Sequence, residues 1–225
     1  MSLRNPVQLT NARGSVIVTQ PAIEPVTAAE FKSQVRDDAL TDAEALAWVT
    51  TARAYIEEMN NFAIITQTWR LALDRWPSGR EKWWDGVRQG SRTELYGPSS
   101  FSDVPLPRYP LQSITSVTTF DTGNNATAVT VADVFNVDTY RTPGRLALRF
   151  GQTWPIALRE TNAIVIDYAA GYGTAAGDVP APIKQGILLM AASLYENRGD
   201  GCSTVDAYAM SGARGMVEIY RAKVI

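Results

Sequence analysis

The sequence contains no histidine and only one cysteine, Cys202, among its 225 residues. The lack of histidine excludes Ser-His-Asp triads, Cys-His dyads and metal sites built on histidine. One cysteine cannot form a disulfide within the chain, which excludes a disulfide-stapled secreted fold. Cys202 lies in Gly-Asp-Gly-Cys-Ser-Thr, a composition typical of a loop. The chain is therefore expected to fold without disulfides.

Long apolar runs and the common phosphate and calcium motifs are missing as well. No run reaches the roughly 18 apolar residues of a membrane span, and the N-terminus lacks a signal-peptide core. No P-loop, GxGxxG fingerprint or EF-hand loop is present. The net charge of −2 is far from that of a protein that wraps nucleic acid. We expect no metal, no cofactor and no enzyme activity. The alternative that the missing histidine does not exclude is a hydrolase that uses two carboxylates.

Two capping boxes mark helix starts near the N-terminus. Thr27-Ala-Ala-Glu30 and Thr41-Asp-Ala-Glu44 each place a threonine at the N-cap and a glutamate three residues later. The first helix should end near Arg36. The second should span 42–60 and bury the residues at helical spacing, namely Ala45, Leu46, Val49, Ala52, Ile56 and Met59. Glu57 and Glu58 are predicted to form a solvated helix edge.

A β-rich region is predicted over 63–173. Trp69, Leu71 and Leu73 alternate with other residues in the run 64–74, which is the period of a strand. Further strand signals lie at 93–96, 113–120, 127–131, 134–137, 146–150 and 163–168. Short turns join them, which favours an antiparallel meander over parallel βαβ units. One more short strand is expected at 16–18, within an extended N-terminal segment 1–24.

Helical spacing returns after Pro180. A helix over 181–198 carries Ile183, Ile187, Met190 and Leu194 on a wide apolar arc, so it should be buried on more than one side. A second stripe follows a polar loop and consists of Met210, Ala213, Met216, Val217 and Tyr220. The fold class is therefore α+β: helices 27–60 and 181–221 form a bundle, and the antiparallel β-rich region is inserted between them. Residues 25–225 are predicted to form one domain.

Two groups of residues are candidate interfaces. Trp83 and Trp84 lie beside Arg80 and Lys82 in a predicted exposed loop, and exposed tryptophan and arginine dominate binding hot spots. Alternatively, the indoles fold back onto the sheet, or join Trp76 as a carbohydrate-binding platform. The second group is Met210, Met216, Val217 and Tyr220, which can dock on their own chain or on the next subunit.

Other clusters favour structural interpretations. The acids at 37, 38, 42 and 44 suit helix N-termini better than a cation site, because they lack calcium-loop spacing. Gly171-Tyr-Gly173 is more typical of a turn than of a phosphate cradle. The sequence thus offers binding surfaces rather than reactive groups.

The order of motifs resembles the head–tail connector proteins of tailed double-stranded-DNA bacteriophages. The first motif, Pro25-Val-Thr-Ala-Ala-Glu-Phe-Lys32, is similar to the family's opening "PVTLAEAK" helix. The others follow in the family's order: Asp37-Asp38, Ala52-Arg-Ala-Tyr-Ile-Glu-Glu58, Ile65-Thr-Gln-Thr-Trp-Arg-Leu71, Leu106-Pro-Arg-Tyr-Pro-Leu-Gln-Ser-Ile-Thr-Ser-Val117, Ile166-Asp-Tyr-Ala-Ala-Gly-Tyr-Gly173, Val179-Pro-Ala-Pro-Ile-Lys-Gln-Gly-Ile-Leu-Leu189 and Tyr195-Glu-Asn-Arg198.

The resemblance spans roughly residues 25–221 and implies a structural virion protein. Such subunits form a ring beneath the portal protein and continue the channel for double-stranded DNA. The implied partners are further copies of the chain, the portal and a neck or tail completion protein, with assembly in the bacterial cytoplasm. A tail-side completion protein is the close alternative. The family has no catalytic residues to carry over.

Overall fold

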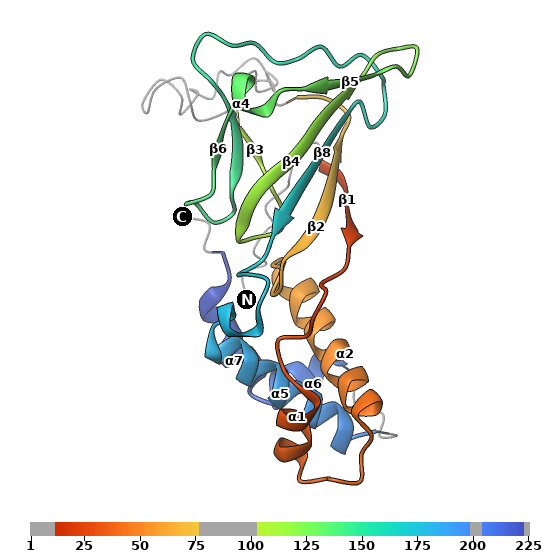
Figure 1. The fold of residues 1–225 in the computed structure, drawn as a ribbon, viewed down its shortest axis with the longest axis vertical. Helices are drawn as coiled ribbons and strands as arrows, with labels where there is room; N and C mark the ends of the chain where they lie inside the picture. The colour runs from red at the N-terminus through yellow and green to blue at the C-terminus, as the bar shows by residue number, and fades with distance from the viewer. Residues whose placement is uncertain (1–11, 77–102, 199–203, 223–225) are drawn as a thin grey trace, which may run out of the picture. The chain divides into compact units, whose positions relative to one another are not determined.

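The computed structural model describes residues 12–76, 103–198 and 204–222, and the chain divides into two compact units (Figure 1). The β unit comprises the residues up to Val18 together with Thr68–Pro107 and Leu111–Ala169. The helical unit comprises Thr19–Gln67, Arg108–Pro110 and Ala170–Ile225. The N-terminal segment contributes a strand to the β unit.

Helices α1 (Ala28–Val35) and α2 (Asp42–Asn60) begin at the predicted capping boxes. The amide of Glu30 donates to the Thr27 hydroxyl at 3.2 Å, and the Thr27 amide donates back to the Glu30 carboxylate at 2.7 Å. Thr41 and Glu44 repeat this exchange at 3.3 and 3.0 Å. Each helix ends at a left-handed residue, Arg36 or Asn61. Four backbone donors at the helix starts are thus satisfied locally.

Helix α5 (Ala181–Glu196) forms the centre of the helical unit. It follows the 3₁₀ turn η1 (Ala176–Asp178) and packs against α1, α2 and two C-terminal helices. Ile183, Ile187 and Met190 are fully buried on one face, and the burial of Gly186 and Ala192 together with contacts to four helices confirms that α5 is covered on more than one side. Phe31 of α1 and Val49 of α2 belong to the same apolar core.

The predicted buried face of α2 is correct only in part. Ala45, Val49, Ala52 and Ile56 are fully buried, but Leu46 and Met59 are 37% and 44% exposed. The polar residues Arg53, Glu57 and Asn60 are buried instead. They can occupy inward positions because each finds hydrogen-bond partners inside the unit.

The C-terminal segment is broken into α6 (Thr204–Met210), α7 (Ala213–Val217) and the 3₁₀ turn η2 (Glu218–Tyr220). The break falls at Gly212, whose φ of 79° favours glycine. The predicted continuous stripe is therefore wrong: Ala213 and Val217 are fully buried, whereas Met210 and Met216 are 80% and 42% exposed. The helix α7 packs on α5 of its own chain, which is the first of the two expected alternatives.

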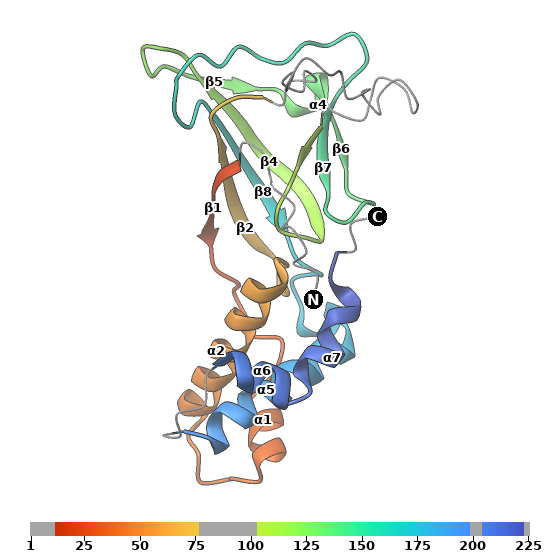
Figure 2. The same ribbon diagram turned by 180° about the vertical axis from the view of Figure 1, so that it is seen from behind.

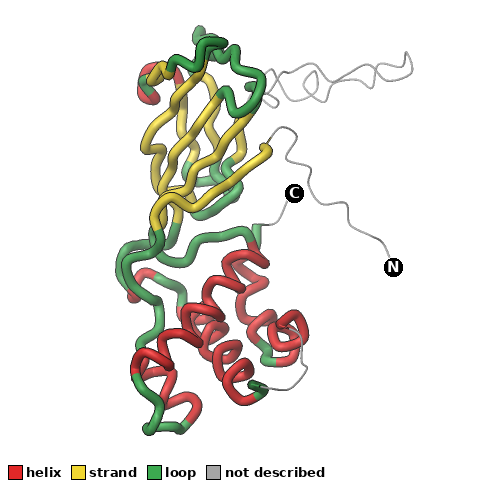
Figure 3. The backbone as a smooth tube through the Cα atoms, turned by 90° about the vertical axis from the view of Figure 1, so that its right-hand side faces the viewer, coloured by secondary structure: helices red, strands yellow, loops and turns green. Residues whose placement is uncertain are grey.

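The β unit contains two sheets (Figure 2). The five-stranded sheet has the order β1-β2-β8-β4-β5, and its strands are β1 (Ala12–Thr19), β2 (Gln67–Leu73), β8 (Ile164–Ala170), β4 (Leu111–Phe120) and β5 (Ala126–Val129). The three-stranded sheet has the order β3-β7-β6, with β3 (Asp103–Pro105), β7 (Arg145–Leu148) and β6 (Phe135–Asp138). The pairs β4–β5, β6–β7 and β3–β7 are antiparallel. The predicted α+β class is confirmed, and Figure 3 shows both kinds of element along the chain.

The strand predictions locate most of these elements but not their order in the sheets. A simple meander would place strands in chain order, whereas β8 lies between β2 and β4. The short strand β3 was missed, because three residues carry no periodic signal. Residues Val131–Val134 form one helical turn, α4, between the strand signals at 127–131 and 134–137. The signal at 93–96 lies outside the described residues.

Candidate functional site

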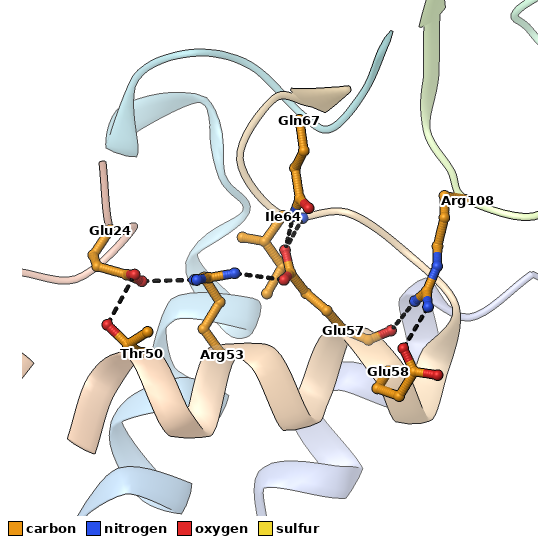
Figure 4. A network of polar contacts seen from close by, with 8 residues as sticks. All are labelled: Glu24, Thr50, Arg53, Glu57, Glu58, Ile64, Gln67 and Arg108. Atoms are coloured by element: carbon orange, nitrogen blue, oxygen red, sulfur yellow. Dashed lines mark hydrogen bonds and ion pairs between the residues drawn. The ribbon is translucent and has the colours of Figure 1, made fainter. Parts of the chain in front are cut away.

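The helical unit contains a buried polar network centred on Glu57 of α2 (Figure 4). One carboxylate oxygen of Glu57 accepts from the Ile64 amide at 2.8 Å and from the Gln67 side chain at 2.5 Å. The other accepts from Arg53 at 2.5 Å. Glu57 retains only 6% exposure. The prediction of a solvated edge is therefore wrong for Glu57, although it holds for Glu58, whose side chain is 74% exposed.

Arg53 and Arg108 extend the network in two directions. Arg53 donates to Glu24 at 2.7 Å, and Glu24 also accepts from Thr50 at 2.9 Å. Arg108 donates to the Glu57 carbonyl at 2.9 Å and pairs with Glu58. The segment before α1, the turn after α2 and residues Arg108–Pro110 are thereby attached to one helix.

A second set of contacts holds the C-terminal segment near the end of α2. The Tyr109 hydroxyl donates to the Asn60 carbonyl at 2.7 Å and accepts from the Ala222 amide at 2.8 Å. The Asn60 side chain donates to the Tyr208 hydroxyl at 3.1 Å. Segments far apart in the sequence therefore meet at the C-terminal end of α2.

Burial raises the pKa of Glu57 above its ordinary value of 4.5, and the Arg53 charge and the Ile64 amide offset only part of this shift. A raised pKa means that folding takes up a proton. The stabilising contribution is full below pH 4.5 and is lost as the pH rises through the raised value. The donors to this carboxylate, Arg53, Ile64 and Gln67, all lie in the helical unit, so it serves structure.

We expect the pH dependence of stability to change in the Glu57→Gln variant. The glutamine cannot titrate, so the wild type should lose stability relative to the variant as the pH rises above 4.5. Urea unfolding of both proteins from about pH 4 to about pH 8, a range that begins just below the ordinary pKa of a glutamate and extends well above it, measures the difference. If the wild type instead gains stability relative to Glu57→Gln as the pH rises, the pKa of Glu57 is not raised.

The predicted interface residues fall into three groups: some lie outside the described residues, some are buried and some are exposed. Arg80, Lys82, Trp83 and Trp84 lie outside the described residues. Val217 is fully buried and Tyr220 is half-buried, with its ring 6.4 Å from that of Tyr172. Met210 and Met216 are exposed.

Trp76 does not form an exposed platform. It is only 9% exposed, stacks on Trp154 with ring centroids 4.6 Å apart and donates from its indole nitrogen to the Pro155 carbonyl at 2.8 Å. Its ring also lies 5.7 Å from that of Phe135. Trp76 is therefore not part of an exposed carbohydrate-binding platform, and the other two tryptophans of that hypothesis, Trp83 and Trp84, lie outside the described residues.

The remaining clusters serve the fold. Asp37 accepts from the Tyr195 hydroxyl at 2.5 Å, and Asp42 pairs with Lys32 at 2.6 Å. Gly171 lies in a turn against the chain after α2, where the Tyr172 amide donates to the Ile64 carbonyl at 3.1 Å. Across the described ranges, no group of three or more acidic, histidine or cysteine side chains is placed to hold a metal ion. No helix in those ranges is long and apolar enough to cross a bilayer.

The chain is similar to several solved structures, but its sequence matches no known family. No protein-family model matches the chain, and no curated protein sequence matches it either. A chain from the neck of an empty gene transfer agent (GTA) particle, computed with C6 symmetry, aligns with a TM-score of 0.70 at 23% identity, over 94% of this chain and 97% of that one.

Two further solved chains share the fold. One comes from the virion of a native gene transfer agent particle, with a TM-score of 0.70, 23% identity and coverage of 94% and 96%. The other comes from the neck of the native particle computed with C12 symmetry, with a TM-score of 0.64, 23% identity and coverage of 93% and 97%. The chain therefore has the fold of proteins found in these phage-like particles.

Proposed function

We propose that this chain is a non-enzymatic structural subunit of the neck of a tailed phage or phage-like particle. Copies of it form a ring between the portal and the tail and continue the channel for double-stranded DNA. The observation that carries the proposal is the match over 94% of this chain and 97% of a GTA neck chain. Nearly the whole of both chains corresponds, so the likeness is more than a shared small module.

Symmetry and charge support the same function. The neck structures were computed with C6 and C12 symmetry, which arranges identical copies around one axis. The net charge of −2 suits a channel wall that DNA must pass without being held. The order of sequence motifs similar to head–tail connectors agrees with both points. The proposed location is the virion, after assembly in the host cytoplasm.

Co-assembly with the portal protein from the same genome tests this function. We expect negative-stain electron microscopy to show an added ring on the portal when both proteins are mixed, and a weaker tendency to form rings from this chain alone. The portal supplies contacts that shift assembly by mass action. Binding to a tail protein with no affinity for the portal would favour the tail-side completion protein instead. Absence of rings with either partner would refute the proposal.

A further inference from the structure

The five-stranded sheet of the β unit has two edges with little protection against further pairing. Its edge strands are β1 and β5, and no strand in the described ranges lies beyond either of them. β1 has no proline and no charged residue after Arg13, and β5 has neither. Val16 and Val18 of β1 are 61% and 50% exposed. Natural proteins often guard an edge with charges or proline, because an open edge is a template for another strand.

The three-stranded sheet of the same unit is guarded. Its edge strands are β3 and β6, and Pro105 takes one of the three positions of β3. Each of these edges also carries an aspartate. Arg145 of the central strand pairs with both, with Asp103 at 2.9 Å and with Asp138 at 3.0 Å. The contrast between the two sheets favours a binding role for the open edges of the larger one.

The hairpin between β4 and β5 holds one open edge in place. The Asp121 carboxylate accepts from the amides of Gly123 and Asn125 at 2.8 and 2.9 Å, and the Asp121 amide donates to the Asn125 carbonyl at 3.2 Å. Bonded and non-bonded pairs alternate along an antiparallel ladder, so Ala126 and Ala128 direct their amides and carbonyls away from β4. Both residues are exposed. An edge that is already ordered loses less freedom when a partner pairs with it.

The partner that fits an open sheet edge is another extended backbone, whose amides and carbonyls continue the ladder. A second copy of the chain offers such an edge at the opposite end of the same sheet. Pairing of β1 with β5 of the next copy uses both open edges. This contact is heterologous, and rotation that repeats it closes a ring. Pairing of β1 with a second β1 would stop at a dimer and leave both β5 edges open.

We propose that β1 of one copy pairs with β5 of the next, so that the five-stranded sheets form one continuous sheet around the ring. The residues that pair, within Gly14–Thr19 and Ala126–Val129, carry no charge, so the contact brings no like charges together. The β-branched side chains of Val16 and Val18 suit a paired strand. The contact rests on the proposed function, because only a ring uses the same two edges at every subunit boundary.

Paired cysteines test the contact in the full-length chain. Cys202→Ser removes the native thiol, and Val16→Cys with Ala128→Cys then places one thiol on each open edge. Within one chain these edges are four strand spacings apart, about 19 Å, so a thiol cross-linker of about 10 Å cannot join them. With the portal present, this cross-linker should give a ladder of covalent oligomers. Each single-cysteine variant should give no ladder, and a mixture of the two should give dimers only.

Val16→Cys with Asn136→Cys is the matched control, since Asn136 is an exposed residue on the guarded edge strand β6. This pair should give no ladder. Rings that give no ladder with Val16→Cys and Ala128→Cys, or a ladder equally strong in the control, overturn the contact alone. Cross-linking of Val16→Cys to the portal shows that another virion protein supplies the strand, and it also overturns the contact. Wild-type protein that forms no ring on the portal counts against the proposed function itself.

Ala128→Pro tests the hydrogen bonds of the contact. The Ala128 amide faces outward, so proline removes a donor of the contact and leaves the bonds between β4 and β5 in place. Ring assembly should require about tenfold more of this variant, because an acceptor in the contact is left without its donor. Ala128→Ser keeps the amide and should assemble like the wild type. A folded Ala128→Pro variant that forms rings at the wild-type concentration overturns the contact; if the variant does not fold, the cysteine pair decides alone.

Discussion

Replacing Glu57 with alanine should lower the free energy of unfolding by about 3–5 kcal/mol, because it removes one partner of a buried ion pair and leaves the other charged. Arg53 would keep its charge at 5% exposure with only Glu24 to neutralise it. The Ile64 amide and the Gln67 side chain would also lose their acceptor. Urea unfolding monitored by circular dichroism measures the loss.

The neighbouring residue provides the matched control. Glu58 has the same chemistry, and its contact is an ion pair with Arg108, but its side chain is 74% exposed. Glu58→Ala should therefore cost less than Glu57→Ala: Glu58 itself is largely in water, and Arg108, whose side chain is 8% exposed, loses this partner but keeps its hydrogen bond to the Glu57 carbonyl. Equal losses in the two variants would show that Glu57 is not the centre of a buried network.

Gly171→Ala should be the other strongly destabilising substitution, with a loss of about 3 kcal/mol. Gly171 has a φ of 143°, a conformation that residues with a Cβ rarely adopt. A Cβ there would lie 2.6 Å from the Thr66 nitrogen and 2.7 Å from the Ile65 carbonyl carbon. These are backbone atoms, so no side-chain rotation can relieve the overlap.

Gly177→Ala is the control for this site. A Cβ on Gly177 meets nothing within 4 Å, so the variant should be as stable as the wild type or slightly more stable. Thermal and urea unfolding of the two glycine variants give the comparison. If both alanines are tolerated, the turn at 171–173 is not held as closely against the segment after α2 as the hydrogen bonds indicate.

Local signals in the sequence were sufficient for the helix starts. The capping boxes at Thr27 and Thr41 involve residues only three positions apart, so their hydrogen bonds depend little on the rest of the fold. The wide apolar arc of α5 likewise predicted burial on several sides, because one helix carries the whole pattern. The alternation over Trp69, Leu71 and Leu73 located β2 for the same reason.

Pairing between distant segments was not predictable in this way. The spacing of Arg53 and Glu57, four residues apart on one helix, allows an ion pair, but nothing in it indicates that the pair is buried or that Ile64 and Gln67 donate to Glu57. From the sequence Trp76 could be an exposed aromatic residue, but in the structure it stacks on Trp154, which lies 78 positions later in the chain. The order of strands in the two sheets depends on similar long-range contacts.

The sequence by itself therefore determined where the main helices begin, where most of the described strands lie and that the fold is α+β. These properties follow from hydrogen bonds and apolar periodicity over a few residues. Only the tertiary structure decided which polar groups are buried and which apolar ones remain outside. Arg53 and Glu57 are buried because Glu24 before the helix and Ile64 and Gln67 after it offset the cost of removing their charges from water. Leu46 and Met59 stay exposed at the two ends of the same helix.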